Sequence, residues 1–541
     1  MNSWRNQEGI SFISRIYPVR PDTLNNAPQL NELVSKKKLA RNVFLNLFGY
    51  GIPLFVAVFT IPVIIRALGT DRFGILTIAW VLIGYLGLFD MGLGRALTKL
   101  VAERLGSDSS QQIPALIWTA LFVMLGIGTA VAIIASTTLP FMARELLKVP
   151  VQLKNETYTA FLILILFTPI IIISVGFRGV LDAYQRFDLT NAVRIPLGLF
   201  TFIAPLLVIP FSVSLVPLFV VLMAGRLVAM LVQMLFCFRI IPDLRTNITI
   251  HRSLLGPLLK FGGWMTVTNI ITPLMMYADR FVIGTLISVT AVAYYATPGE
   301  VVTKLLLISS SLMGVLFPAF SSTFENNQEK TISMFSKGVK YIYLVMFPIV
   351  LAILVLTREG LTFWLGTEFA IQSTLVMQLM TVAIFFISMG RVPYALIQGV
   401  GRPDITAKLH MSELPIYLVI LWIAVQRFGI KGAAFVWMLR ALIDSALLYF
   451  FARRLLAQPD PVRPPPLLSG PIFSWPRILL LIAGCSFLLL IILFRVSLSA
   501  RLSLLVLFSG IHIWTGWVFF LDLTEKEMII NALSFMRLHK T

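Results

Sequence analysis

The chain has 541 residues, of which 58% are apolar and only 13% are charged. Soluble domains have about 45–50% apolar and about 25% charged residues, so this composition excludes an ordinary soluble enzyme and indicates a polytopic membrane protein. The net charge of +19 would suggest nucleic-acid binding in a soluble protein. In a membrane protein it first reports orientation, because Lys and Arg concentrate in cytoplasmic loops, and we expect no nucleic-acid partner.

Residues 1–35 are polar and lack the apolar core of a signal peptide, which predicts a cytoplasmic tail without a fixed fold. A membrane helix needs about 20 apolar residues. By that measure the rest of the chain predicts fourteen helices, at 42–65, 73–94, 113–136, 157–176, 192–210, 215–238, 264–286, 291–318, 341–357, 374–397, 411–426, 431–452, 478–494 and 502–521.

The charge distribution predicts the orientation of these helices. With the N-terminus inside, Lys and Arg in the inside segments outnumber those in the outside loops by about three to one. A missed or extra helix would scramble this alternation. We therefore expect both termini to be cytoplasmic in a multi-pass protein of the inner, or cytoplasmic, membrane.

The spans divide into groups of similar length. Six fill residues 36–240 and six fill residues 255–457, which predicts an all-α fold of two six-helix lobes, a common transporter plan. The Pro-rich stretch 458–476 then predicts an extended linker. Residues 477–541 predict an accessory helix pair with a cytoplasmic tail.

Common signatures of catalysis and metal binding are absent. The chain contains no phosphate-loop motif, no His-Glu-x-x-His and no Gly-x-Ser-x-Gly. The cysteines Cys237 and Cys485 are far apart, and the four histidines are not at ligand spacing from one another. We expect neither an enzyme nor a metal or cofactor site.

Eight charged residues lie deep within predicted spans. Each mid-membrane charge costs about 2.5–3.5 kcal/mol, so such residues usually face a water-filled cavity or pair with one another. We take them as candidate substrate-binding residues: Arg226, Asp279, Arg280, Glu300, Lys304, Arg391, Arg440 and Asp444.

Two interpretations of these charges stay open. Glu300 with Lys304 and Arg440 with Asp444 are spaced i,i+4 and share helix faces, so the pairs could simply neutralise each other. Arg391 could instead extend to the membrane surface. The full set nevertheless has more cations than anions, which favours an anionic cargo such as a diphosphate, since Arg binds phosphate bidentately.

Four residues are candidate gating positions. Pro53 and Pro273 lie in spans that open the two lobes and could be bending points for alternating access or plain packing kinks. Asp90 and Arg95 flank a Gly-rich helix end, which is either a capped, close-packed turn or an inner gate with ion pairs.

Several stretches together resemble polysaccharide-biosynthesis flippases. Residues 66–74 (RALGTDRFG) lead into 86–95 (LGLFDMGLGR), which is similar to the start of that family. Residues 277–284 (YADRFVIG) and 291–296 (AVAYYA) resemble the opening of its second half, and 363–369 (FWLGTEF) an outside motif. The resemblance covers residues 36–457, and its superfamily also holds multidrug antiporters and the peptidoglycan-precursor flippase.

The resemblance implies a two-lobed transporter that moves undecaprenyl-diphosphate-linked oligosaccharide to the outer leaflet. It implies membrane lipid, a polysaccharide polymerase and a chain-length regulator as partners, and coupling to an H⁺ or Na⁺ gradient. It carries a functional role directly onto Asp279 and Arg280 alone. Two alternatives stay open: a cation-coupled multidrug antiporter, and an integral-membrane polysaccharide polymerase or ligase.

Overall fold

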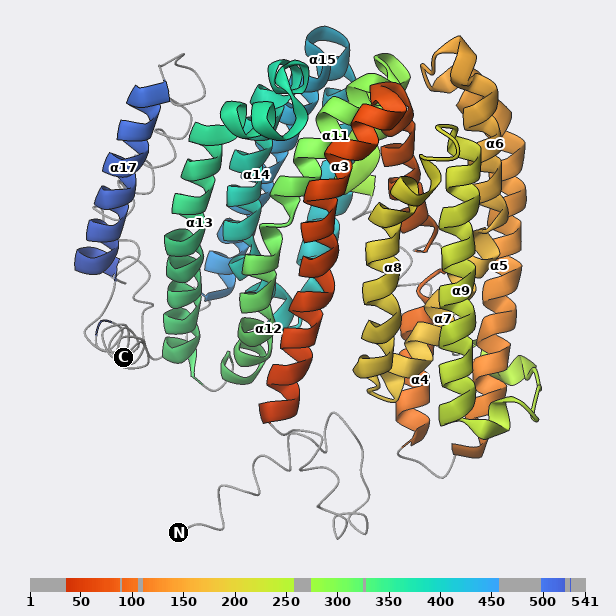
Figure 1. The fold of residues 1–541 in the computed structure, drawn as a ribbon. Helices are drawn as coiled ribbons and strands as arrows, with labels where there is room; N and C mark the ends of the chain where they lie inside the picture. Colours follow the sequence, from red (N-terminus) through yellow and green to blue (C-terminus); the bar gives the residue numbers. More distant parts are fainter. Residues whose placement is uncertain are drawn as a thin grey trace, which may run out of the picture. The chain divides into compact units, whose positions relative to one another are not determined.

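The computed structural model describes residues 36–87, 90–105, 110–256, 274–324, 327–456, 498–520 and 526. All secondary structure in these ranges is helical, which confirms the predicted all-α class (Figure 1). The predicted tail 1–35, the linker 458–476, the span 478–494 and Pro273 lie outside the described residues.

The chain divides into two compact units. The first comprises Met1–Tyr277 with Ser288–Thr290, and the second comprises Ala278–Ile287 with Ala291–Thr541. The main helices of the first unit are α3 (Lys36–Leu86), α4 (Leu93–Leu105), α5 (Ile113–Phe141), α6 (Lys154–Leu166), α7 (Thr168–Ala183), α8 (Phe187–Val208) and α9 (Leu215–Ile240).

The second unit is built in the same manner from long apolar helices. It contains a helical segment at 278–286 and most of α11 (Val289–Thr303). The remaining helices are α12 (Leu306–Thr323), α13 (Gln328–Leu365), α14 (Thr367–Gly399), α15 (Pro403–Leu456) and α17 (Leu498–Thr515). Helix α14 packs against α12, α13 and α15, and α17 lies beside α13 (Figure 1).

Two helices are long enough for two membrane crossings. Helix α3 has 51 residues and α15 has 54. At about 1.5 Å per residue each far exceeds a hydrocarbon core of about 30 Å. Each is broken at a glycine with positive φ, Gly69 (φ 79°) and Gly429 (φ 61°), a conformation that L side chains rarely adopt. These turns separate the two predicted spans within each helix.

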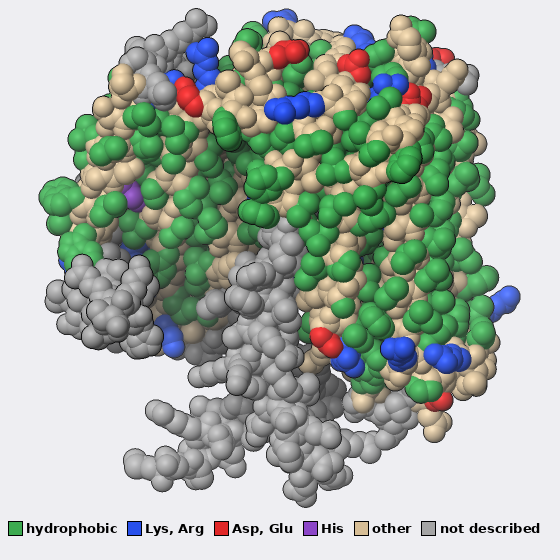
Figure 2. All heavy atoms as spheres, viewed as in Figure 1, with side chains coloured by type: hydrophobic (Ala, Val, Ile, Leu, Met, Phe, Trp, Pro, Cys, Tyr) green, Lys and Arg blue, Asp and Glu red, His purple; other side chains and the backbone are tan. Residues whose placement is uncertain are grey.

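The described helices have the surface of a membrane protein. Nine of them are long and apolar enough to cross a bilayer within the described ranges. Large apolar side chains such as Phe122, Phe211 and Phe363 are exposed, and Figure 2 shows hydrophobic side chains over the middle of the visible face with charged ones toward helix ends. This confirms a polytopic membrane protein; the total of fourteen spans stays a prediction.

Small residues bring α4 and α7 into close contact. A Cβ on Gly179 would lie 2.6 Å from the carbonyl oxygen of Gly94, so only glycine fits at this crossing. The Thr98 hydroxyl lies 2.9 Å from the carbonyl oxygens of both glycines and donates to them. Such small-residue crossings are typical of packed membrane helices. This contact fixes α7 at the residue next to Arg178.

Candidate functional site

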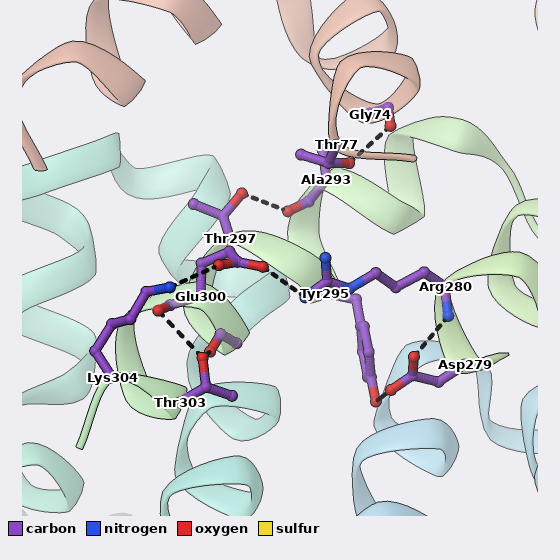
Figure 3. A network of polar contacts seen from close by, with 11 residues as sticks. Gly74, Thr77, Asp279, Arg280, Ala293, Tyr295, Thr297, Glu300, Thr303 and Lys304 are labelled. Atoms are coloured by element: carbon purple, nitrogen blue, oxygen red, sulfur yellow. Dashed lines mark hydrogen bonds and ion pairs between the residues drawn. The ribbon is translucent and has the colours of Figure 1, made fainter. Parts of the chain in front are cut away.

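Four predicted site residues form one network in the second unit (Figure 3). Arg280 Nη2 lies 2.8 Å from Glu300 Oε1, and Lys304 Nζ lies 3.5 Å from Glu300 Oε2. Asp279 accepts hydrogen bonds from the backbone N–H of Arg280 at 2.8 Å and from the Tyr295 hydroxyl at 2.6 Å. Two cations and two carboxylates balance, so this network contributes no surplus charge.

Burial explains why these groups are paired. Asp279 and Arg280 are 3% and 7% exposed. Removing a charge from water costs several kcal/mol unless a partner and hydrogen bonds compensate it. The arrangement around Glu300 favours mutual neutralisation, which is one of the two interpretations that its spacing from Lys304 left open.

A second group gathers on α14 and α15. Arg391 lies on α14, and Arg440 and Asp444 lie on α15. Asp444 Oδ1 is 3.4 Å from His410 Nε2, whereas the guanidinium carbon of Arg440 lies 5.3 Å from the centre of the Tyr417 ring. The structure therefore places Asp444 with a histidine rather than with Arg440, its neighbour one helical turn away.

This group includes three residues that could hold a cation. Ligand atoms of His410, Glu413 and Asp444 lie within 4.8 Å of one another. Both carboxylate oxygens of Glu413 lack a hydrogen-bond partner among the described residues. The turn at Gly429 folds α15 back on itself and brings these residues together. Sequence reasoning sought histidines spaced near one another and missed this cluster, although Glu413 lies inside the predicted span 411–426.

The first unit contains a pocket of about 300 Å³ that is rich in arginine. Three guanidinium groups line it: Arg178 from α7, Arg194 from α8 and Arg226 from α9. No carboxylate is among the lining residues, which are Ile83, Gly84, Gly87, Ile171, Ser174, Val175, Arg178, Val193, Arg194, Leu197, Arg226 and Gln233.

The polar groups around this pocket leave a positive surplus. Ser174 donates a 2.7 Å hydrogen bond to Gln233, which holds two neutral groups in the wall. Asp182 acts electrostatically on Arg178 and Arg194 from outside the lining. Arg226 forms no ion pair with a carboxylate in the described part of the chain. The pocket is thus suited to an anion.

Of these three arginines, the sequence prediction included only Arg226. It counted both Arg178 and Arg194 as charges of the cytoplasmic segments. Arg178 follows the predicted span that ended at 176, and Arg194 is the third residue of the span predicted to begin at 192. In the structure α7 continues to Ala183 and α8 begins at Phe187, so both arginines lie on helices. Polar residues in the last turns of a membrane helix depress hydropathy, which is why the spans were predicted too short.

The gating candidates have ordinary structural surroundings. Pro53 lies in α3 against Gly198 of α8, where an added Cβ would lie 2.9 Å from the proline ring. The buried Asp90 accepts hydrogen bonds from the backbone N–H groups of Gly92 at 2.9 Å and Gly94 at 2.8 Å. Arg95 is exposed and forms no ion pair with Asp90 within the described residues. These contacts favour a capped turn, and gating stays a prediction.

The cap at Asp90 lies between α3 and α4, outside the spanning helices. Burial raises the pKa of its carboxyl, while the N–H groups of Gly94 and Gly92 and the charges of Arg178 and Arg95 act in the opposite direction. The hydrogen bonds therefore offset only part of the cost of burying the carboxylate.

We expect Asp90→Ala to lower the free energy of unfolding by about 1–2 kcal/mol, because two backbone donors lose their acceptors. Asp90→Asn keeps one acceptor oxygen and should cost less. Thermal unfolding of the full chain in detergent measures both. The exposed Arg95→Ala variant is the control. If it abolished transport at unchanged stability, Arg95 would be a gate residue and the turn would be more than a cap.

Comparison with known proteins places the chain in context. Residues 39–324 match the family model described as polysaccharide biosynthesis protein. The chain is 28% identical over 419 residues to a Shigella flexneri protein named as an O-antigen transporter, covering 77% of this chain and 98% of that one. It is 24% identical over 394 residues to the lipopolysaccharide biosynthesis protein WzxC of Escherichia coli, covering 72% and 75% respectively.

Solved structures share the fold at low sequence identity. The lipid II flippase MurJ aligns with a TM-score of 0.62 at 12% identity, covering 87% of this chain and 99% of that one. A multidrug resistance transporter of the MATE family aligns with a TM-score of 0.61 at 15% identity, covering 76% and 98%.

Proposed function

Because the chain belongs to the polysaccharide biosynthesis protein family, we propose that it is a flippase for a lipid-linked oligosaccharide. The carrier is undecaprenyl diphosphate, and the protein moves it across the cytoplasmic membrane by alternating access for surface polysaccharide synthesis. Relatives named as an O-antigen transporter and a lipopolysaccharide biosynthesis protein support this assignment. They are transport and biosynthesis proteins rather than hydrolases, so no catalytic residue is proposed.

The arginine pocket of the first unit is the observation that carries the proposal. A diphosphate spreads its negative charge over several oxygens, and a planar guanidinium can bind two of them at once. Arg178, Arg194 and Arg226 line one pocket without a carboxylate. In surroundings of low dielectric such an arrangement attracts an anion strongly and repels a cation.

The positive charge of the arginine pocket argues against the antiporter alternative. A transporter of cationic drugs needs carboxylates or aromatic rings where its cargo binds. In the second unit Glu300 is instead paired with Arg280 and Lys304, and Asp444 with His410. Asp279, Glu300 and Asp444 are the groups through which an H⁺ or Na⁺ gradient would act.

In the proposed function both termini lie in the cytoplasm, and a polysaccharide polymerase and a chain-length regulator are partners.

Depletion of the protein in its own cells tests the proposal. Lipid-linked glycan is then expected to accumulate on the cytoplasmic face, where periodate added to spheroplasts cannot oxidise it, and re-expression should restore oxidation. A membrane protein of unrelated function, depleted in parallel, is the control. Normal surface polysaccharide combined with altered drug tolerance would contradict the proposal and support the antiporter.

A further inference from the structure

An apolar groove of about 460 Å³ lies between α8 and α9 of the first unit. Small residues on α9 open it: Ala224 is exposed, and at Gly225 an added Cβ would lie 2.3 Å from the Phe200 ring. Phe200 therefore lies directly over Gly225. Every lining residue is apolar.

The groove and the arginine pocket share a wall. Val193 and Leu197 line both. On α8, Val193 of the groove precedes Arg194 of the pocket, and on α9, Gly225 of the groove precedes Arg226 of the pocket. Two helices thus present a hydrocarbon surface on one side and guanidinium groups on the other, within one compact unit.

We propose that this groove holds the isoprenoid chain of the cargo while its diphosphate occupies the arginine pocket. This inference rests on the proposed function. A hydrocarbon chain is stable only in apolar surroundings and a diphosphate only in polar ones. The two compartments adjoin at Val193 and Leu197, so one amphipathic molecule that bends over these side chains could reach both. Three guanidiniums offer enough donors for the oxygens of two phosphates, more than the single phosphate of a phospholipid can use.

Photolabelling of the full chain tests the placement. The protein is placed in nanodiscs of phosphatidylethanolamine and phosphatidylglycerol, and irradiated with geranylgeranyl diphosphate that carries a diazirine on its chain. We expect label within residues 192–200 and 221–232. Excess inorganic diphosphate should remove that label, because the head group anchors the chain. A phosphatidylglycerol with the same diazirine should label these residues independently of inorganic diphosphate, and only weakly.

A matched pair of variants tests the groove itself. Ala224→Phe fills it and should reduce labelling about tenfold, the scale of steric changes in apolar sites. Val220→Phe is the control, since Val220 lies one turn earlier on α9, is 49% exposed and does not line the groove. It should label like the unchanged protein.

Two outcomes overturn the inference. Equal labelling by both probes, unaffected by inorganic diphosphate, would assign the groove to ordinary membrane lipid. Equal loss in Ala224→Phe and Val220→Phe would place the chain elsewhere. Calorimetry with inorganic diphosphate separates this failure from that of the proposed function. If inorganic diphosphate binds in a manner that depends on Arg226 but the groove is not labelled, only the groove inference is contradicted. If inorganic diphosphate does not bind, the role of the arginine pocket in the proposed function is contradicted.

Discussion

Arg226→Gln is expected to reduce transport of the lipid-linked glycan about ten- to a hundredfold while the protein remains inserted and folded. A hydrogen bond to a charged group contributes about 1.5–3 kcal/mol, which corresponds to that range. Arg226 lines the pocket without a carboxylate partner among the described residues, so its loss removes an anion contact and breaks no ion pair. Stability should be unchanged or slightly higher.

Transport into vesicles and thermal unfolding, measured on the same preparation, check this expectation. Arg239→Gln is the matched control, because Arg239 is an exposed arginine in the last turn of the same helix and does not line the pocket. Arg226→Lys keeps the charge without bidentate geometry and should transport at an intermediate rate. Normal transport in both Arg226→Gln and Arg194→Gln would remove the pocket from the mechanism.

Arg280→Gln is expected to destabilise the protein by about 3 kcal/mol, the lower end of the range for breaking a buried ion pair. The Arg280 side chain is 8% exposed, but its partner Glu300 is 35% exposed and also contacts Lys304, which limits the loss. The unfolding midpoint in detergent measures the effect.

The double variant Arg280→Gln, Glu300→Gln should recover part of that stability, since it removes the Glu300 carboxylate that Arg280→Gln leaves without its closer cation. Lys304→Gln is the control for this network and should cost less than about 1 kcal/mol, because its side chain is 41% exposed. If Arg280→Gln were as stable as the unchanged protein, the ion pair would contribute nothing to folding. Transport should be compared in the double variant, because a defect there is less affected by loss of stability than a defect in Arg280→Gln.

The charges at membrane depth show how far sequence reasoning reached. It identified Asp279, Arg280, Glu300 and Lys304 as costly residues that must be compensated, and the structure joins them in one network. It did not anticipate Glu413 or His410, and it counted Arg178 and Arg194 as charges of the cytoplasmic segments. Glu413 was omitted because it lies near one end of the predicted span 411–426, and only charges deep within spans were counted.

Most of the residues that gave the predicted surplus of positive charge lie in a different unit from the arginine-rich pocket. The prediction counted the charged residues deep in predicted spans, and most of these lie in the second unit. There the cations are accompanied by carboxylates and a histidine. The structure shows the arginine-rich pocket in the first unit. Counting charges along a chain cannot reveal this, because a count contains no information on which side chains face one another.

Hydropathy and charge alone determined that this protein is an all-α, polytopic membrane protein, because the bilayer imposes length and polarity on each helix separately. They also indicated which residues are costly to bury. Only the tertiary structure decided which of them meet. Arg178, Arg194 and Arg226 come from three helices, and Glu413 meets Asp444 only because α15 turns at Gly429. Packing between helices determines these neighbours, and no local property of the sequence specifies it.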